Sequence, residues 1–287
     1  MSWKDFSKLV KMRLTFLVVF SASISFLIGS KVNGHIDWVN WVKLIIGGFF
    51  VTAAANCFNE IIEKDLDKLM KRTKDRPMPA GRMTTGQGLV IGLFMGIAGT
   101  ILLAKLNPTA GYLSVFSVLL YAFAYTPLKQ KSPVAVFVGA IPGALPPLIG
   151  YVAAHPQIDE IALILFGIQF VWQFPHFWAI AWVLDDDYKL AGFRLLPSGK
   201  RDLTSAIFAF VSTLILIPVS LLPTYYGYGG YYVGGVSLIC GLVFLYLAFK
   251  LLKDRDIPSA KKLMYGSFFY LPVVQLMFLF DFIGKVK

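Results

Sequence analysis

Hydrophobic residues gather in nine runs along the chain, and each run is about as long as a membrane-crossing helix. Roughly 20 consecutive apolar residues span the hydrocarbon core of a bilayer as an α-helix. The runs cover residues 14–33, 40–60, 88–106, 109–127, 134–153, 159–182, 204–224, 231–249 and 264–283. We therefore expect an all-α, polytopic membrane protein. A single domain over residues 1–287 would form nine transmembrane helices around a central cavity.

The composition supports a membrane protein and leaves little chain for a soluble domain. Hydrophobic residues make up 57% of the chain, charged residues 15%, and the mean hydropathy is +0.67. Soluble domains carry about 25% charged residues. The first run is long and lacks a small-residue cleavage site, so we do not expect it to be removed as a signal peptide. Cys57 and Cys240 are too few for a disulfide framework or a thiolate metal site.

Lysine and arginine are distributed unevenly between the segments that connect the runs. Most of the 27 basic residues lie before the first run or after the second, fourth, sixth and eighth. Because cytoplasmic loops are enriched in Lys and Arg, we expect the N-terminus and these segments on the cytoplasmic side of a plasma (inner) membrane. This distribution and the anionic lipid bilayer account for the net charge of +11. No nucleic acid partner is expected.

The most informative polar residues stand where the second run leaves the membrane. Asn59, Glu63 and Asp67 are spaced i, i+4 and i+8, so on a helix they share one face. Oxygen-bearing side chains in this arrangement suit a hard divalent cation that holds a polyphosphate. Asp65 faces another side and could take part from there, whereas we expect Glu60 at the membrane interface. The alternative is that these acids only cap the span and neutralise nearby lysines.

Two further pairs of residues could contact phosphate. Arg72 and Arg76 form another i, i+4 pair before Pro77, and Arg suits bidentate contact with phosphate. Tyr125 and Lys129 stand one helical turn apart at the end of the fourth run. The Lys could contact phosphate, and the Tyr a leaving oxygen or a cation. The simpler interpretations are positive-inside charge for the arginines and an aromatic belt with a snorkelling Lys for the second pair.

The sixth run carries a histidine with two interpretations. Of three histidines, only His176 lies within a predicted span. Buried histidines are commonly hydrogen-bonded structural residues, and Gln173, three positions earlier, could be the partner of His176. The alternative is a contact or an axial ligand to a haem-like iron.

The segment from Val183 to Asp202 follows this run and contains three adjacent acids, of which we favour Asp187 and Asp186 as groups that complete a metal site. It repeats the order of acids, Arg and Pro found about 120 residues earlier, in the segment from Glu63 to Gly88. This faint repeat suggests two related halves that face each other across a cavity, with a ninth helix appended.

These residues resemble a known family. Asn59-xxx-Glu63-xxx-Asp67, followed by Arg72-Thr73 and Arg76-Pro77, resembles the first Asp-rich motif of the intramembrane UbiA-type prenyltransferases. The segment 125–129 is similar to the tyrosine–lysine segment of that family. The segments 173–178 and 187–197 resemble segments of the branch that acts on haem. The resemblance spans nearly the whole chain.

The resemblance implies transfer of a farnesyl group from farnesyl diphosphate to a vinyl group of haem B, with addition of water, to give haem O. It implies Mg²⁺ as the cofactor, held by Asn59, Glu63 and Asp67. It also implies roles in binding the diphosphate or the haem, together with Tyr125 near the allylic cation. The residues with these roles are Arg72, Arg76, Lys129, His176, Gln173, Asp65, Asp187, Lys189 and Arg194. Lys189 or Arg194 would contact a propionate of the haem. Asp187 would also contact Mg²⁺. It suggests a haem-A synthase as a protein partner.

The chain departs from the family pattern in three places. Glu63 stands where Asp is usual, and Gln130 where a basic residue often follows the lysine. Val183 stands four residues before Asp187, so the second cluster lacks a clean Asp-xxx-Asp pair and two symmetrical magnesium clamps are not expected. The alternatives are a prenyltransferase that acts on an aromatic quinone precursor and an ion-coupled transporter. Transporters place their key polar groups near the bilayer midplane, whereas these acids cluster at its rim.

Overall fold

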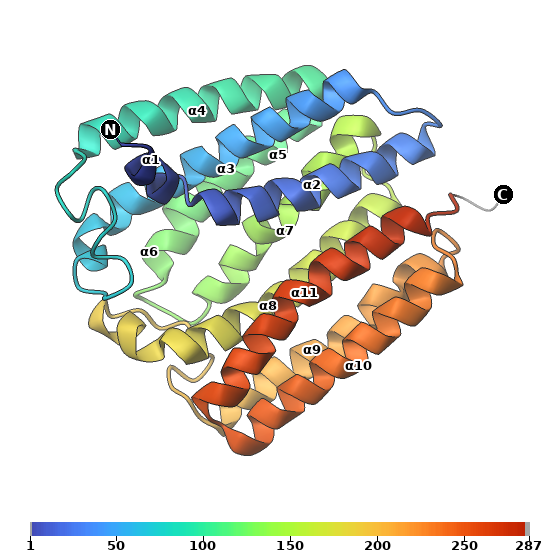
Figure 1. Ribbon diagram of the computed structural model, residues 1–287. Helices are drawn as coiled ribbons and strands as arrows, with labels where there is room; N and C mark the ends of the chain where they lie inside the picture. Colours follow the sequence, from blue (N-terminus) through green and yellow to red (C-terminus); the bar gives the residue numbers. More distant parts are fainter. Residues whose placement is uncertain (1, 285–287) are drawn as a thin grey trace.

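The computed structural model describes residues 2–284, and within them nine helices are long and apolar enough to cross a membrane, as predicted (Figure 1). A short helix α1 (Trp3–Leu9) precedes them. The spans are α2 (Met12–Val32), α3 (Trp38–Asp67), α4 (Thr85–Leu106), a composite of α5 (Pro108–Leu119), η1 (Leu120–Tyr125) and α6 (Thr126–Leu128), α7 (Ala135–Ala154), α8 (Glu160–Leu190), α9 (Leu203–Tyr225), α10 (Tyr231–Asp254) and α11 (Ile257–Phe280).

Several helices begin at a residue whose side chain caps the first turn. Asp37 accepts a hydrogen bond from the backbone N–H of Asn40, and Asp256 from that of Ser259. Thr84 and Gln87 form a reciprocal capping box at the start of α4. Such caps satisfy N–H groups that have no partner inside the helix. The cap at Asp256 explains why α11 starts at Ile257, seven residues before the apolar run from which the span was predicted.

The helices pack as a closed circuit in which the first and last spans meet. Along the chain, α3 packs on α4, α4 on α5, α7 on α8, α8 on α9, α9 on α10 and α10 on α11. Helix α2 packs along α7, and α11 contacts both α8 and α2 (Figure 1). A Cβ atom at Gly150 of α7 would lie 1.9 Å from the carbonyl oxygen of Ala22 in α2. Only glycine therefore permits this close backbone contact.

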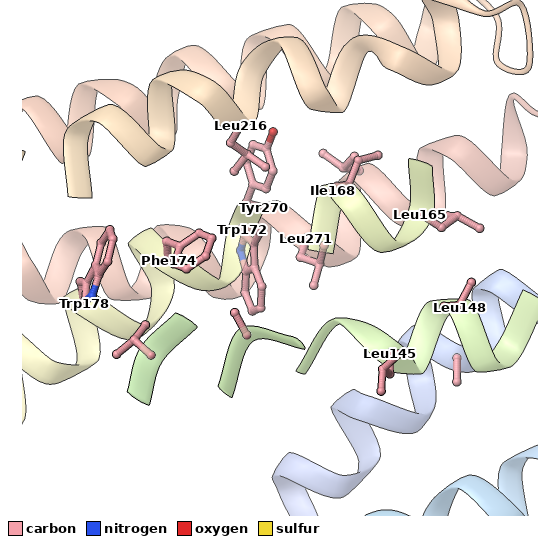
Figure 2. Packing of buried hydrophobic residues seen from close by; sticks show 14 of the residues in the cluster. Leu145, Leu148, Leu165, Ile168, Trp172, Phe174, Trp178, Leu216, Tyr270 and Leu271 are labelled. Atoms are coloured by element: carbon pink, nitrogen blue, oxygen red, sulfur yellow. The ribbon is translucent and has the colours of Figure 1, made fainter. Parts of the chain in front are cut away.

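The interior is apolar and aromatic, and hydrogen bonds of buried polar side chains link its helices. Figure 2 shows side chains of α7, α8, α9 and α11 packed together, among them Trp172, Phe174 and Tyr270. Gln169 of α8 accepts hydrogen bonds from Ser21 of α2 (2.6 Å) and Gln275 of α11 (2.9 Å). The Gln169 amide donates in turn to a carbonyl of α7. Buried polar groups of this kind are satisfied within the protein because hydrocarbon offers no partner.

The outer surface of the bundle exposes large apolar side chains. On α4, for example, Val90, Phe94 and Ile97 are each at least 60% exposed. A soluble monomer rarely exposes contiguous apolar surface of this extent. Lipid contact explains the pattern, so these faces fit a multi-pass membrane protein.

Two helices run further than their apolar runs predicted, and the loops behind them are shorter. Helix α3 continues to Asp67 and α8 to Leu190, whereas the runs end at residues 60 and 182. The predicted loops from Glu63 to Gly88 and from Val183 to Asp202 shrink to residues 68–84 and 191–202. Hydropathy detects only the part of a helix that lies in hydrocarbon. The polar turns beyond it are held by side-chain contacts described below.

Candidate functional site

The end of α3 lines a cavity of about 170 Å³. Seven of the residues singled out from the sequence meet there: Asn59, Glu63, Asp67, Arg72, Arg76, Tyr125 and Lys129. Apolar and aromatic side chains complete the wall, namely Leu14, Met70, Tyr121, Tyr188, Phe193 and Leu195. The cavity therefore has both charged and apolar lining residues. Such a lining suits a ligand with an anionic head and an apolar chain.

The three residues of the predicted metal face point into this cavity. Asn59, Glu63 and Asp67 are buried, with no more than 3% of each residue exposed. Each side chain has a polar contact across the cavity. Asp67 accepts from Arg76 at 2.5 Å, Glu63 forms an ion pair with Lys129, and the Asn59 amide donates to Thr126 at 3.0 Å. The three residues thus lie on one face of α3, as their spacing predicted. Two of them form ion pairs from this face with Arg76 and Lys129.

This donor set fits a magnesium ion that carries a diphosphate. Asp67 Oδ1 is buried and has no hydrogen-bond partner among the described residues, so one carboxylate oxygen is available to a cation. Within residues 2–284 no cluster of three or more His, Cys, Asp or Glu side chains is arranged to hold a metal. Mg²⁺ commonly uses only one or two carboxylates, together with waters and substrate phosphates. Two carboxylates and an amide oxygen therefore suffice.

A π-helical turn places the tyrosines of the fourth span. Residues 120–125 form the wider turn η1, followed by Thr126 and then by Pro127, which has no N–H to donate to the preceding turn. Tyr121 and Tyr125 both line the cavity as a result. The Lys129 ammonium lies 4.9 Å from the ring centre of Tyr125. A Cβ atom at Gly139 of α7 would lie 2.6 Å from the Tyr125 ring, so that glycine makes room for it.

Lys11 is a cavity residue that the sequence interpretation missed. It stands between α1 and α2 with a left-handed backbone (φ 47°), and its ammonium donates to Asn59 Oδ1 at 2.6 Å. Burial and the nearby charge of Arg76 lower the pKa of Lys11 to about 7. In the sequence it looked like one of several positive-inside residues. A basic residue directly before the first span was the only available signal.

The sequence suggested that Glu60 lies at the membrane interface, but this prediction is wrong. Glu60 is fully buried in the structure. Its carboxylate accepts a hydrogen bond from the backbone N–H of Met78 at 3.1 Å. The side of α3 that carries Glu60 is covered by the loop 68–84, which hydropathy does not reveal. Glu60 therefore fixes the loop that bears Arg72 and Arg76.

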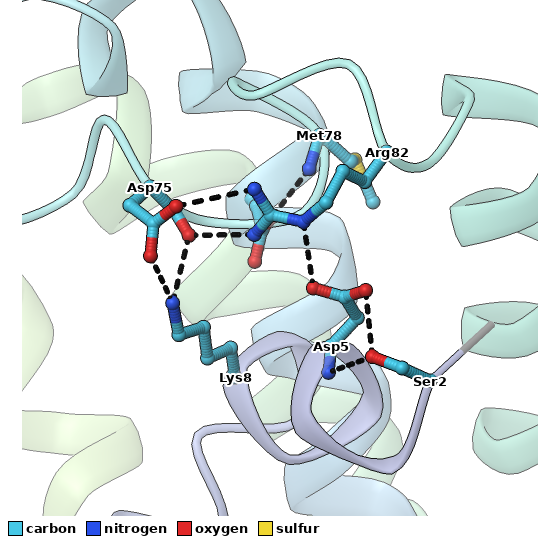
Figure 3. A network of polar contacts seen from close by, with 7 residues as sticks. Ser2, Asp5, Lys8, Asp75, Met78 and Arg82 are labelled. Carbon is cyan, nitrogen blue, oxygen red and sulfur yellow. Dashed lines mark hydrogen bonds and ion pairs between the residues drawn. The ribbon is translucent and has the colours of Figure 1, made fainter.

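The N-terminal helix α1 holds the same loop from outside (Figure 3). Asp5 accepts from Arg82 Nε at 2.9 Å, while Lys8 donates to the carbonyl oxygen of Asp75 at 3.0 Å and forms an ion pair with its carboxylate. Hydrogen bonds from Ser2 and Arg82 hold the pKa of Asp5 below its usual value. The hydrogen bond from Lys8 does the same for the pKa of Asp75. We call these four residues (Asp5, Lys8, Asp75 and Arg82) the N-terminal brace.

Three predicted acids, Asp65, Asp186 and Asp187, lie outside the cavity lining. Asp65 is exposed and pairs with Lys68 at 2.8 Å. Asp187 accepts hydrogen bonds from the backbone N–H groups of Lys71 (2.7 Å) and Arg72 (3.4 Å). Asp187 thus positions the arginine-bearing loop instead of facing α3. The other acids of its cluster are engaged locally, because Asp185 pairs with Lys189 at 2.7 Å and Asp186 with Arg201 at 3.0 Å.

The candidates of α8 face its neighbouring helices. His176 Nδ1 lies 2.7 Å from Ser267 Oγ of α11, and the imidazole stacks on Trp172 with ring centres 4.3 Å apart. Gln173 packs against α7, where a Cβ atom at Gly143 would lie 2.7 Å from its amide nitrogen. The hydrogen bond anticipated between Gln173 and His176 is not among those of residues 2–284, because the two side chains point to different helices.

The last two predicted residues, Lys189 and Arg194, line a second, more open cleft of about 510 Å³. It lies between the loop 191–202 and Pro133, just before α7. Phe193 lines both the cavity and this cleft.

Comparisons with known proteins identify the family of this chain. A family model described as the UbiA prenyltransferase family matches residues 18–273. Two relatives named protoheme IX farnesyltransferase come from Cytophaga hutchinsonii and Christiangramia forsetii. The first is 45% identical to this chain, over 97% of this chain and 98% of its own length. The second is 43% identical, over 96% and 93%.

Solved structures show the same fold. A digeranylgeranylglyceryl phosphate synthase structure superimposes with a TM-score of 0.80 at 21% identity, over 97% of both chains. A UbiA homolog from Archaeoglobus fulgidus, bound to GPP and Mg²⁺, gives a TM-score of 0.70 at 12% identity, over 96% of this chain and 99% of that one. The family model covers most of the chain, and the named relatives match it almost from end to end. The chain therefore belongs to the UbiA prenyltransferase family.

Proposed function

We propose that the protein transfers a farnesyl group from farnesyl diphosphate to a vinyl group of haem B and so produces haem O. The observation that carries the proposal is the cavity in which Asn59, Glu63 and Asp67 face Arg76 and Lys129. The names of the relatives, protoheme IX farnesyltransferase, support this choice of substrates. The UbiA homolog that binds GPP and Mg²⁺ supports magnesium as the cofactor.

Asn59, Glu63 and Asp67 would hold Mg²⁺, and Arg72, Arg76, Lys129 and Lys11 would bind the diphosphate oxygens. When bound, Mg²⁺ neutralises charge on the diphosphate and makes it a better leaving group. In the structure the acids and bases of the cavity are paired with each other, as Asp67 is with Arg76 and Glu63 with Lys129. When the metal and the diphosphate bind together, the acids would exchange their basic partners for Mg²⁺. The basic residues would exchange their acidic partners for the diphosphate.

The transfer itself conserves atoms as follows. The bond between C1 of farnesyl and the diphosphate oxygen breaks, and diphosphate leaves with the electron pair. The vinyl group of haem B attacks the allylic cation, so that a carbon–carbon bond forms. Water then adds to the resulting cation and releases one proton. Tyr125 lies beside Lys129 and could stabilise the cation through its ring, while the apolar wall limits the access of water to the cation before the vinyl group attacks.

We propose that the remaining polar residues act on the haem or on the loops. His176 would position the haem, with its bond to Ser267 fixing the ring, and Gln173 would support the same turn of α8. The bond to Ser267 equally fits a structural role between α8 and α11. Asp187 would orient Arg72 through its backbone. The catalytic loops would lie on the cytoplasmic side of the plasma membrane, and a haem-A synthase would accept the product.

A reaction with purified protein tests this function. We expect release of pyrophosphate from farnesyl diphosphate only when haem B and Mg²⁺ are both present, with a haem product whose mass has increased by one farnesyl and one hydroxyl group. Removal of the metal with a chelator should stop the reaction, and added Mg²⁺ should restore it. A parallel reaction with 4-hydroxybenzoate tests the quinone alternative. Prenylation of that acceptor in preference to haem B would overturn the proposal.

A further inference from the structure

The second cleft and the cavity share one lining residue, Phe193. Phe193, only 5% exposed, lines both spaces, and the Lys129 ammonium lies 5.1 Å from its ring centre. The cleft is open to the surface. The cavity by itself is too small to hold a porphyrin. Pockets for molecules of that size occupy about 300–1,000 Å³, and the cavity has about 170 Å³.

The floor of the cleft is fixed to the segment that carries Lys129. The backbone N–H of Arg194 donates to the Lys129 carbonyl oxygen at 2.8 Å, and the Gln130 amide donates to the carbonyl oxygen of Ala191 at 3.0 Å. These bonds tie the loop 191–202 to the end of the fourth span. A ligand seated in the cleft would therefore be held at a set position relative to the reaction centre.

The cleft is basic. Its lining contains Lys189 and Arg194 and no acidic side chain. Arg194 is exposed and forms no ion pair within residues 2–284. Lys189 pairs with Asp185, but Arg201 Nε also approaches that carboxylate, at 3.8 Å. Lys189 is engaged with Asp185 and Arg201 with Asp186, so the uncompensated charge of the cleft is that of Arg194, which suits an anion of the carboxylate class.

The acceptor of the proposed function has its carboxylates at one edge. Haem B carries two propionates on the side of the porphyrin that lies away from its vinyl groups. If a vinyl group reaches the cavity near Tyr125, the propionates extend across the width of the ring toward the surface. The cleft and the cavity adjoin at Phe193, which lines both.

We propose that this cleft is the carboxylate subsite for the haem, in which Arg194 and Lys189 pair with the two propionates and Phe193 lies against the porphyrin. The inference rests on the proposed function and adds the site that selects and orients the acceptor. Movement of the Phe193 ring would join the two spaces, so that a porphyrin could extend from one into the other.

Haem binding to full-length protein tests the subsite without requiring turnover. Quenching of tryptophan fluorescence would give the Kd for haem B and for its dimethyl ester, in which the propionates carry no charge. We expect Arg194→Gln and Lys189→Gln each to weaken binding of haem B by about tenfold. The ester should bind the wild-type protein as weakly as haem B binds the variants, and neither substitution should weaken the ester further.

The matched control is Lys200→Gln, an exposed basic residue of the same loop that does not line the cleft. It should bind haem B as the wild-type protein does, and the KM for farnesyl diphosphate should change in none of the three variants. Equal affinity for haem B and its ester would overturn the subsite, even in a protein that makes haem O. An effect of Arg194→Gln that occurs only in vesicles with anionic lipid would instead assign the cleft to a lipid phosphate and would also overturn it.

Discussion

Single residues decide whether the end of α3 works as a metal site. Asp67 is buried and has one oxygen without a hydrogen-bond partner, whereas Asp65, two positions earlier, is exposed and paired with Lys68. We expect Asp67→Asn to lower turnover by about a hundredfold or more, because a neutral amide cannot replace a carboxylate on Mg²⁺ or on Arg76. Asp65→Asn, the same chemical change on the same helix, should leave turnover within about twofold of wild type, since surface pairs contribute little.

Folding must be measured alongside activity, because loss of Asp67 leaves Arg76 without its buried partner. Size-exclusion chromatography and thermal unfolding in detergent would show whether Asp67→Asn stays folded. Glu63→Gln offers a second route to the same conclusion, since Glu63 contacts a different cation. Full activity in a folded Asp67→Asn or Glu63→Gln protein would refute the magnesium assignment.

Lys11 supplies a test of the diphosphate contacts that the sequence did not predict. Its ammonium donates to Asn59, and Lys11 lines the cavity together with Glu63 and Asp67. Lys11 is not part of the sequence motif that contains these three residues. Lys11→Met keeps the apolar stem and removes the charge, so we expect the KM for farnesyl diphosphate to rise by about tenfold. The Kd for haem B should not change. Steady-state kinetics with each substrate varied in turn separates the two effects, and a change confined to haem would contradict the placement.

At the scale of elements, the contact between α7 and the π-turn positions Tyr125. A methyl group at Gly139 would overlap the Tyr125 ring, whereas one at Gly235 of α10 meets no atom within 4 Å. We therefore expect Gly139→Ala to lower kcat by about tenfold or more, because the ring and the adjacent Lys129 must move. Gly235→Ala is the matched control and should keep wild-type activity. Activity assays on both proteins, with their yields of folded protein, check the prediction.

The N-terminal brace gives a second element-scale prediction. The pKa values of Asp5 and Asp75 are lowered in the folded protein, so the brace is complete above their ordinary value of 3.8 and is lost as the pH falls through the lowered pKa values. At neutral pH, Arg82→Gln should loosen the loop 68–84. Hydrogen exchange of its amides should accelerate, and the KM for farnesyl diphosphate should rise severalfold. Unchanged exchange in this loop would mean that Glu60 and Asp187 fix it without the brace.

Local sequence patterns predict the spans and the metal face, but not the contacts that form between distant segments. The nine apolar runs and the spacing of Asn59, Glu63 and Asp67 are local signals, and the structure follows both. The contacts of Lys11 and Glu60 depend on how α1 and the loop 68–84 cover α3, which no local pattern records. Asp187 looked like a metal ligand because of its neighbours in sequence. Its carboxylate instead reaches backbone N–H groups of a loop more than a hundred residues away.

At the scale of the whole molecule, the site is assembled from distant parts of the circuit of helices. Lys11 precedes the first span, the acids end the second, Tyr125 and Lys129 end the fourth, and Phe193 follows the sixth. Each acid of the cavity already has a basic partner from another segment. The ion pairs therefore link the segments, and a ligand must replace every pair that it breaks.

This arrangement predicts cooperative binding of metal and diphosphate. Mg²⁺ alone would leave the partly buried Arg76 and the buried Lys129 without partners. Diphosphate alone would do the same to Asp67 and Glu63, so each ligand should bind weakly by itself. Together they satisfy both sets of charges. We expect a non-reactive farnesyl diphosphate analogue with Mg²⁺ to stabilise the protein by about 2.7 kcal/mol at 100 times its Kd. Either one alone should leave the thermal unfolding temperature nearly unchanged, and additive shifts would show that the two bind independently.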